Sequence, residues 1–303
     1  MKEEFQKGRV ILGLMRLNDI SSERLYDIIS KAINMGIHYF DISDIYCNHD
    51  AERKLGSVIK AHPEIRKEMF IQTKCGIVRD TPGKTYMDLS YQHIIEAVDA
   101  SLERMNLTYI DSLLLHRVDI FMDAHEVGMA LNELRDTGKV FHFGVSNMDK
   151  EMIEYLSQEL SFPFEVDQLQ VSLGQPSLLS QTFNVNFPAQ KPNLQDGLFF
   201  YLKKKGITLQ CWSPYQIGFF EGSIFDRKRL PKLNEKLDEL ARKYATSPCA
   251  IATSFLAMLT KDTQVITGSM NEEHIKETME GVTLTMSKED WYDLYVSTGN
   301  LLP

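Results

Sequence analysis

Residues 21–46 read SSERLYDIISKAINMGIHYFDISDIY, a stretch that predicts one helix followed by one strand. Apolar residues recur at helical spacing between positions 25 and 33, and Ser21 or Ser22 precedes them as a candidate N-cap. The run Ile37–Asp41 is rich in β-branched and aromatic residues, which is typical of a buried strand. The stretch therefore predicts a crossover helix that leads into a strand of a parallel sheet.

The same alternation of amphipathic segments and short apolar runs continues along the chain, and it indicates repeated βαβ units. A second helical pattern lies around Ile94–Met105, and a third ends just before Gly138, a residue suited to the end of a helix. Eight strands are predicted in all. They are Val10–Leu14, Ile37–Asp41, Met69–Lys74, Tyr109–His116, Val140–Val145, Glu165–Val171, Ile207–Trp212 and Gln264–Thr267.

The chain has 303 residues, a length that suits either two domains or one large architecture such as an α/β barrel. Eight βα units in this length favour a closed (β/α)8 TIM barrel over an open sheet with a second domain. We therefore predict an α/β protein with a single domain over residues 1–303. The long segments 78–91, 172–191 and 216–230 all follow predicted strands, so we expect them to form the walls of a substrate site.

Composition excludes several classes of function. With 43% hydrophobic and 25% charged residues the chain resembles an ordinary globular protein, and its apolar runs are too short to cross a bilayer. The N-terminal stretch lacks an apolar signal core, so we expect a cytoplasmic protein without a membrane partner. A net charge of −9 disfavours nucleic acid, and four scattered cysteines without a CxxC pair predict no metal site. The oligomeric state stays open.

Polar residues close three successive predicted strands. Asp41 ends the second strand in HYFDISDIY, Lys74 ends the third in FIQTK, and His116 ends the fourth in SLLLHR. Tyr46 lies five positions after Asp41. Because the C-terminal ends of barrel strands meet at one mouth, these four side chains form a candidate site of proton transfer.

The four residues make chemical sense together. An isolated tyrosine is a poor acid at neutral pH, since its ordinary pKa is about 10, and the ammonium of Lys74 would lower that pKa. Lys74 needs a counter-charge in a dry pocket, which Asp41 can supply. A neutral His116 can orient a carbonyl group by a hydrogen bond. The set can act as an acid that protonates an alkoxide.

Each residue alone also has a plain structural interpretation. Asp41 and Lys74 could form an ion pair without any catalytic role, because such networks also shift pKa values. Tyr46 could be a packed aromatic ring, and His116 could be a hydrogen-bonded core histidine. Their joint placement at successive strand ends is what favours catalysis.

Four motifs in order resemble a known family. FDISDIY followed by AERKLG, then IQTK, LLLHR and GVSN at positions 144–147, is similar to the aldo-keto reductase series over almost the whole chain. The segments MFIQTKCGI, GKVFHFGVSN and GNLLP most resemble bacterial YdhF-like oxidoreductases. The resemblance implies an NAD(P)H-dependent reductase of aldehydes or ketones, with a small-molecule carbonyl as the substrate. It implies Tyr46 as general acid, Lys74 and Asp41 as its tuning pair, and His116 as the residue that orients the substrate.

The resemblance also implies NADPH as the cofactor, with NADH as the alternative. Trp212 would stack on the nicotinamide ring, where the family usually has tyrosine. The other residues implied for the cofactor are Ser146, Asn147 and Gln170 at the carboxamide, and Ser213, Gly268, Ser269, His274, Glu277 and Thr278 elsewhere on the molecule.

The segment VITGSMNEEHIKET at 265–278 departs from the family, which often has proline and basic residues there. No lysine or arginine precedes Lys276 in it, but Gly268, Ser269, Asn271 and a helix N-terminus can offer donors to a phosphate. Lys276 itself, or Arg242 or Arg229 from outside the segment, could also reach the phosphate. We therefore expect a weak preference for NADPH over NADH.

Two other functions are compatible with parts of the pattern. A lysine at a barrel strand end, such as Lys74, could form a Schiff base in an aldolase, although Tyr46 and GVSN would then be unexplained. A non-catalytic or slow nicotinamide-binding regulatory protein is the second alternative, because a fold does not determine a function. Borohydride trapping would reveal the aldolase, and slow turnover with tight cofactor retention would reveal the regulatory protein.

Overall fold

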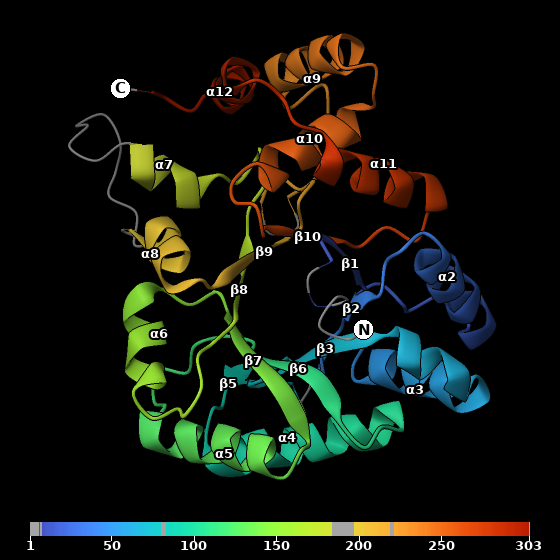
Figure 1. The fold of residues 1–303 in the computed structure, drawn as a ribbon, viewed down its shortest axis with the longest axis vertical. Coiled ribbons are helices and arrows are strands. Elements are labelled where there is room, and N and C mark those ends of the chain that lie inside the picture. The colour runs from blue at the N-terminus through green and yellow to red at the C-terminus, as the bar shows by residue number, and fades with distance from the viewer. Residues whose placement is uncertain (1–5, 7, 80–82, 184–196, 219–220, 303) are drawn as a thin grey trace. The chain divides into compact units, whose positions relative to one another are not determined.

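A computed structural model of the chain describes residues 6, 8–79, 83–183, 197–218 and 221–302, and its main sheet is a closed barrel (Figure 1). The strands follow the order β1-β10-β9-β8-β7-β6-β3-β2, and every strand pair with a recorded register is parallel. This confirms the predicted (β/α)8 architecture. The strands are β1 (Val10–Gly13), β2 (Tyr39–Asp41), β3 (Phe70–Cys75), β6 (Ile110–Leu115), β7 (Val140–Ser146), β8 (Val166–Gln170), β9 (Thr208–Trp212) and β10 (Gln264–Thr267).

The chain falls into two compact units, Met1–Gln168 and Leu169–Pro303. A single domain over residues 1–303 stays a prediction. The first unit contains α2 (Ser22–Asn34), α3 (Asp50–Ala61), a 3-10 helix (Pro63–Glu68), α4 (Tyr91–Met105), α5 (Ala124–Asp136) and α6 (Lys150–Ser157). The second contains α7 (Ser177–Phe183), α8 (Leu198–Lys205), α9 (Pro231–Lys243), α10 (Pro248–Ala257), α11 (Glu272–Thr283) and α12 (Lys288–Ser297).

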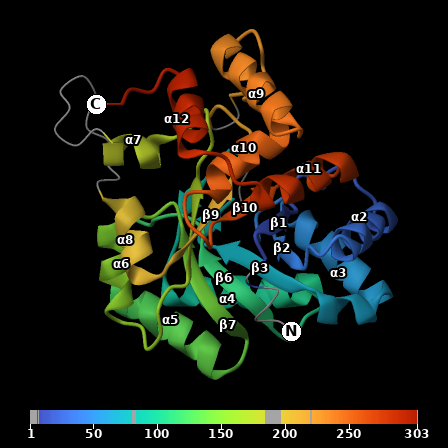
Figure 2. The same cartoon turned by 45° about the horizontal axis from the view of Figure 1, so that its top comes forward.

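In the first unit the helices form an outer layer along the strands, with α3, α4 and α5 side by side (Figures 1 and 2). Ser21 caps α2 by accepting a hydrogen bond from the Arg24 amide at 3.2 Å, as the sequence predicts. Gly56 allows α3 to approach α4, because a Cβ atom at this position would lie 2.1 Å from the Arg104 carbonyl oxygen. Such a close approach requires glycine.

In the second unit α10 is buried on nearly all sides, and α11 packs against it and against β10. The Phe255 ring of α10 stacks on Trp291 of α12 with 4.5 Å between ring centroids. The indole nitrogen of Trp291 also donates to the Phe255 carbonyl at 2.9 Å, so the buried N–H group is satisfied. An apolar helix surrounded by other elements explains why this segment lacks a clear polar face.

One predicted loop has regular structure. The segment 78–91 begins in a small antiparallel ladder between β4 (Ile77–Val78) and β5 (Tyr86–Met87), which the sequence analysis missed because each strand has only two residues. Parts of the other two long segments, at 184–191 and 219–220, lie outside the described residues. Within the described part of the chain, no helix has the length and apolar character needed to cross a membrane.

Candidate active site

The predicted strand ends bring Asp41 and Lys74 together in the first unit. Asp41 pairs in register with Gln72 on the neighbouring strand, so Lys74 lies one side-chain repeat further along the same face of β3. Lys74 Nζ lies 2.7 Å from both Asp41 carboxylate oxygens. The two side chains are 0% and 5% exposed, so this is a buried ion pair.

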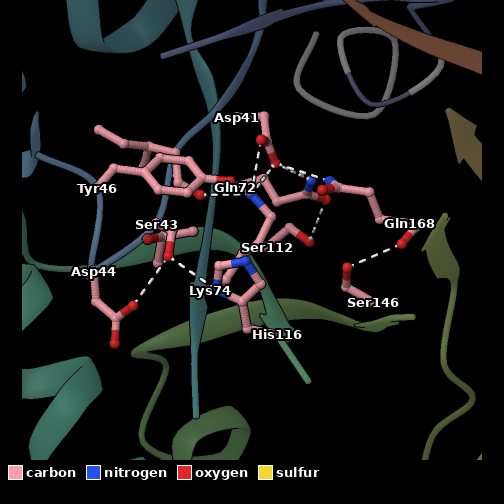
Figure 3. Close-up of polar contacts among 12 residues, drawn as sticks. Asp41, Ser43, Asp44, Tyr46, Gln72, Lys74, Ser112, His116, Ser146 and Gln168 are labelled. Carbon is pink, nitrogen blue, oxygen red and sulfur yellow. Dashed lines mark hydrogen bonds and ion pairs between the residues drawn. The ribbon is translucent and has the colours of Figure 1, made fainter. Parts of the chain in front are cut away.

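The ammonium of Lys74 has further partners (Figure 3). It donates to the Ile42 carbonyl at 2.8 Å and to the Tyr46 hydroxyl at 3.3 Å. Burial by itself would lower the pKa of Lys74, but the Asp41 carboxylate and Tyr46 outweigh burial and raise that pKa above its ordinary value. Lys74 is therefore charged at neutral pH.

Tyr46 lies in the turn between β2 and α3, where Cys47, Asn48 and His49 all have positive φ angles of 52°, 54° and 68°. Three consecutive left-handed residues other than glycine are unusual, and such strain is found at functional sites. The turn directs the Tyr46 hydroxyl toward Lys74 (Figure 3). The Tyr46 ring lies edge-on to the ring of His116, with 6.0 Å between the two centroids.

The pKa of Tyr46 is shifted upward overall. Burial raises the pKa of the phenol, and the Lys74 ammonium lowers it only in part. The lowering effect of Lys74 is present as predicted, but the raising effect of dehydration is larger. As a result Tyr46 keeps its proton at neutral pH, which is the state that a general acid needs.

Two amide side chains hold the Asp41 carboxylate, and the sequence analysis did not single them out. Gln72 and Gln168 donate to Asp41 Oδ1 at 2.7 and 2.9 Å, and Gln72 in turn accepts from the Tyr39 hydroxyl at 2.8 Å. These bonds satisfy a buried anion that would otherwise depend on Lys74 alone. The available signal was a glutamine within each apolar strand, in FIQTK and in VDQLQ.

His116 directly follows β6 and is buried. Burial together with the positive charges of Lys74, Arg117 and Arg79 holds the pKa of the imidazole well below its usual range, so the ring is neutral. Its Nδ1 atom lies 3.1 Å from the Ser43 hydroxyl. Nε2 has no hydrogen-bond partner among the described residues, and it is the ring nitrogen left for a ligand.

Ser43 and Asp44 were also missed by the sequence analysis. The Ser43 hydroxyl lies 3.0 Å from Asp44 Oδ1 as well as 3.1 Å from the imidazole of His116, and all three side chains are buried. Both residues lie within the FDISDIY motif, but the sequence does not reveal that Ser43 contacts a residue 73 positions later.

Ser146 and Asn147, implied for the cofactor, lie at the end of β7 beside His116. The Ser146 hydroxyl donates to the Gln168 carbonyl at 2.9 Å and accepts from Asn147 Nδ2 at 2.7 Å. Asn147 Nδ2 also lies 3.4 Å from the His116 carbonyl oxygen, and Asn147 has a φ of 57°. The structure therefore brings these two residues into contact with His116 and Gln168.

The other residues implied for the cofactor belong to the second unit. Gln170 Nε2 is buried and has no partner among the described residues, so this amide suits a polar ligand. Trp212 ends β9, and Ser213 follows it with a φ of 48°. Both are half-buried.

Gly268 and Ser269 lie between β10 and the start of α11. The Ser269 hydroxyl lies 3.3 Å from His274 Nδ1, which places two polar groups at the N-terminal end of this helix. Glu277 is half-buried, whereas Thr278 is fully buried and bonds to the Tyr215 hydroxyl at 2.8 Å. Polar and aromatic groups suited to a dinucleotide are thus present, and their role in binding stays a prediction.

Comparisons with known proteins identify the family of the chain. The profile of the Aldo/keto reductase family matches residues 9–295. Oxidoreductase YdhF of Escherichia coli is 28% identical over 94% of this chain and 91% of its own length. A 6-dehydroglucose reductase of Agrobacterium fabrum is 29% identical over 97% of this chain and 95% of its own length. In fold, a crystal structure of a thermostable aldo-keto reductase in complex with the inhibitor epalrestat aligns with a TM-score of 0.74 at 22% identity, over 96% of this chain and 95% of that one.

The family match covers nearly the whole chain and includes every residue of the site described above. Lys74 contacts both Asp41 and Tyr46, two residues of the motifs quoted from the sequence. The chain therefore belongs to the aldo/keto reductase family and is an oxidoreductase enzyme.

Proposed function

We propose that this enzyme reduces aldehyde or ketone carbonyls to alcohols with a nicotinamide cofactor, and that Tyr46 is the general acid. One observation carries the proposal: the Tyr46 hydroxyl lies 3.3 Å from an ammonium group that is itself paired with a buried carboxylate. A protonated phenol beside a fixed positive charge suits proton donation to an oxygen that becomes negative during the reaction.

We assign a separate role in the reaction to each of four side chains. When bound, the nicotinamide supplies hydride to the carbonyl carbon. Tyr46 donates its proton to the developing alkoxide, and Lys74 stabilises the phenolate that remains. Asp41 holds Lys74 in place, and His116 Nε2 orients the carbonyl oxygen.

For the cofactor we propose the set of residues that the resemblance implies. Ser146, Asn147 and Gln170 would bind the nicotinamide carboxamide, and Trp212 would stack on the ring. Ser213, Gly268, Ser269, His274, Glu277 and Thr278 would serve the rest of the dinucleotide.

We propose NADPH as the slightly preferred cofactor, with NADH accepted. Lys276 is the first basic residue of the segment after β10, and its Nζ atom lies 2.7 Å from Glu272 on the same helix. Asn271 caps that helix by accepting from the Glu273 amide at 2.9 Å, and two glutamates lie in its first turn. A 2′-phosphate would therefore meet hydrogen-bond donors without a dedicated cation.

The Schiff-base alternative conflicts with the state of Lys74. A carbinolamine needs a neutral amine with a free approach, whereas this amine is buried, charged and bonded to Asp41, Ile42 and Tyr46. The regulatory alternative differs from the proposal in rate rather than in structure, so turnover measurements decide it.

The test is Tyr46→Phe, which removes one hydroxyl and preserves the ring. We expect kcat for carbonyl reduction to fall at least ~100-fold while cofactor affinity, measured by fluorescence titration, stays nearly unchanged. Tyr26→Phe is the matched control, because the Tyr26 ring stacks on His62 away from the proposed site. Retained turnover in Tyr46→Phe would remove Tyr46 from its proposed role.

A further inference from the structure

Ser43 is the centre of a short hydrogen-bonded chain that joins Asp44 to His116 (Figure 3). Its hydroxyl oxygen lies 3.0 Å from Asp44 Oδ1 and 3.1 Å from His116 Nδ1. The three side chains are all nine-tenths or more buried, so water does not replace these contacts easily. None of the steps proposed above uses Ser43 or Asp44.

A hydroxyl group has one proton, so Ser43 can donate either to Asp44 or to His116 but not to both at once. If Asp44 is ionised, it can only accept, so Ser43 must donate to it. The contact with His116 is then donated by Nδ1–H, and a neutral imidazole has a bare lone pair at Nε2. If Asp44 is protonated, it can donate to Ser43, Ser43 donates to Nδ1, and the imidazole proton lies on Nε2.

We propose that Ser43 and Asp44 are positioning residues that determine which nitrogen of His116 carries the proton, and thereby whether Nε2 donates or accepts a hydrogen bond. Between the two arrangements one proton leaves Asp44, while the imidazole stays neutral and its proton changes nitrogen by exchange with solvent. Only the Nε2–H form can donate to a carbonyl oxygen. The consequence for catalysis rests on the proposed function, but the coupling of Asp44 to His116 does not.

The surroundings of Asp44 favour a change near neutral pH. Burial and the Glu52 carboxylate on α3 raise the pKa of Asp44 to about 7, against smaller opposing effects of Ser43 and of Arg104 on α4. Glu52 stays close because it accepts from Arg104 Nε and from Thr73, both at 2.7 Å.

The remaining groups that face this chain come from neighbouring elements. Tyr46 lies in the same turn, and Cys75 of β3 is buried close enough to Asp44 for its thiol pKa to rise in part from that charge. The positive charges of Lys74, Arg117 and Arg79 act on the imidazole and keep it neutral. Titration of His116 itself is thus suppressed, and the proton on Asp44 decides the arrangement.

The direct test is the tautomer of His116 in the enzyme without added ligands. Two-bond correlation spectra of protein labelled with 15N-histidine distinguish Nδ1–H from Nε2–H, and the resonance lost in His116→Gln assigns the ring. We expect Nε2–H at pH 6 and Nδ1–H at pH 8.5, with the midpoint near the Asp44 pKa of about 7. A single tautomer across this range in the wild-type protein would overturn the proposal.

Three variants test the route of the coupling. Asp44→Asn has no titratable proton, so we expect a single tautomer of His116 at every pH, which is Nε2–H where the amide nitrogen donates to Ser43. Ser43→Ala breaks the chain with a smaller change, so the pH dependence should vanish even if Asp44→Asn fails to fold. Asp167→Asn is the control, because it also removes a buried carboxyl of raised pKa but touches neither Ser43 nor His116. A tautomer change that persists unaltered in Ser43→Ala would refute the relay.

The pH dependence of kcat/KM provides a second test. As pH rises through the Asp44 pKa, kcat/KM for reduction should fall roughly tenfold, the equivalent of one hydrogen bond, mainly through KM. The fall should be absent in Asp44→Asn. A wild-type tautomer change without this fall would overturn the role in reduction and leave the relay intact, whereas absent reductase activity would refute the proposed function instead.

Discussion

The buried pair of Asp41 and Lys74 allows a quantitative test. Replacing Asp41 by asparagine keeps the size of the side chain and an acceptor for Gln72 and Gln168, but it leaves the ammonium without a counter-charge. Removing one partner of a buried pair typically costs about 3–5 kcal/mol. We expect the lower end of this range, because Lys74 still donates to the Ile42 carbonyl and the Tyr46 hydroxyl.

The pH dependence of the stability shows in which direction the pKa of Lys74 is shifted. In the wild type the folded pKa of Lys74 is raised, so its contribution is fully present below the unfolded pKa of about 10.4 and is lost as pH rises through the folded value. In Asp41→Asn the strongest effect that opposes burial is gone and only Tyr46 still opposes it, so we expect the folded pKa of Lys74 to fall below the unfolded one. The unfolded chain then binds more protons, so the stability of the variant should rise with pH between about 7 and 10.

Urea denaturation followed by circular dichroism at several pH values measures both effects. The double variant Asp41→Asn with Lys74→Met removes the unpaired charge and should recover ~2 kcal/mol relative to the single variant. A loss under about 1 kcal/mol for Asp41→Asn, or a loss independent of pH, would show that the pair is solvated and would refute the reasoning.

Three further predictions concern other parts of the chain. In Lys74→Met the titration assigned to Tyr46, which reduces the rate on the alkaline side, should move to higher pH, because the cation that lowers the phenol pKa is gone; an unchanged pH–rate profile would show that Lys74 has no such effect. Fluorescence titration should show that NADPH binds better than NADH by far less than the ~1000-fold that dedicated ion pairs would produce, and undetectable NADH binding would contradict this. Gly56→Ala should destabilise the protein by ~3 kcal/mol in thermal or urea unfolding, since its Cβ would lie 2.1 Å from backbone, while exposed Ser57→Ala on the same helix should cost under about 0.5 kcal/mol; similar losses for both would refute the close approach of α3 and α4.

The strands and the grouping of Asp41, Lys74 and His116 at their ends were predictable from local sequence. The eight predicted strands agree with the barrel strands to within a residue or two at their ends, because each is an apolar run between helical patterns. Asp41, Lys74 and His116 were identified for a related reason. Each is a charged or polar side chain at the end of an apolar strand, and the C-terminal ends of barrel strands meet at one mouth. The β4–β5 ladder was missed because two-residue strands leave no periodic signal.

The partners of these residues depended on the tertiary structure. Gln168 donates to Asp41 across 127 positions of sequence, and Ser43 meets His116 across 73. Neither contact follows from a local sequence pattern, since both depend on the register of strands around the barrel. The net direction of the Tyr46 pKa likewise required burial to be known, because dehydration and the Lys74 charge act in opposite senses and only the folded surroundings determine which is larger. Sequence alone therefore determined which side chains gather at the barrel mouth, and the tertiary structure decided their protonation states, which depend on solvent exclusion and on contacts between distant strands.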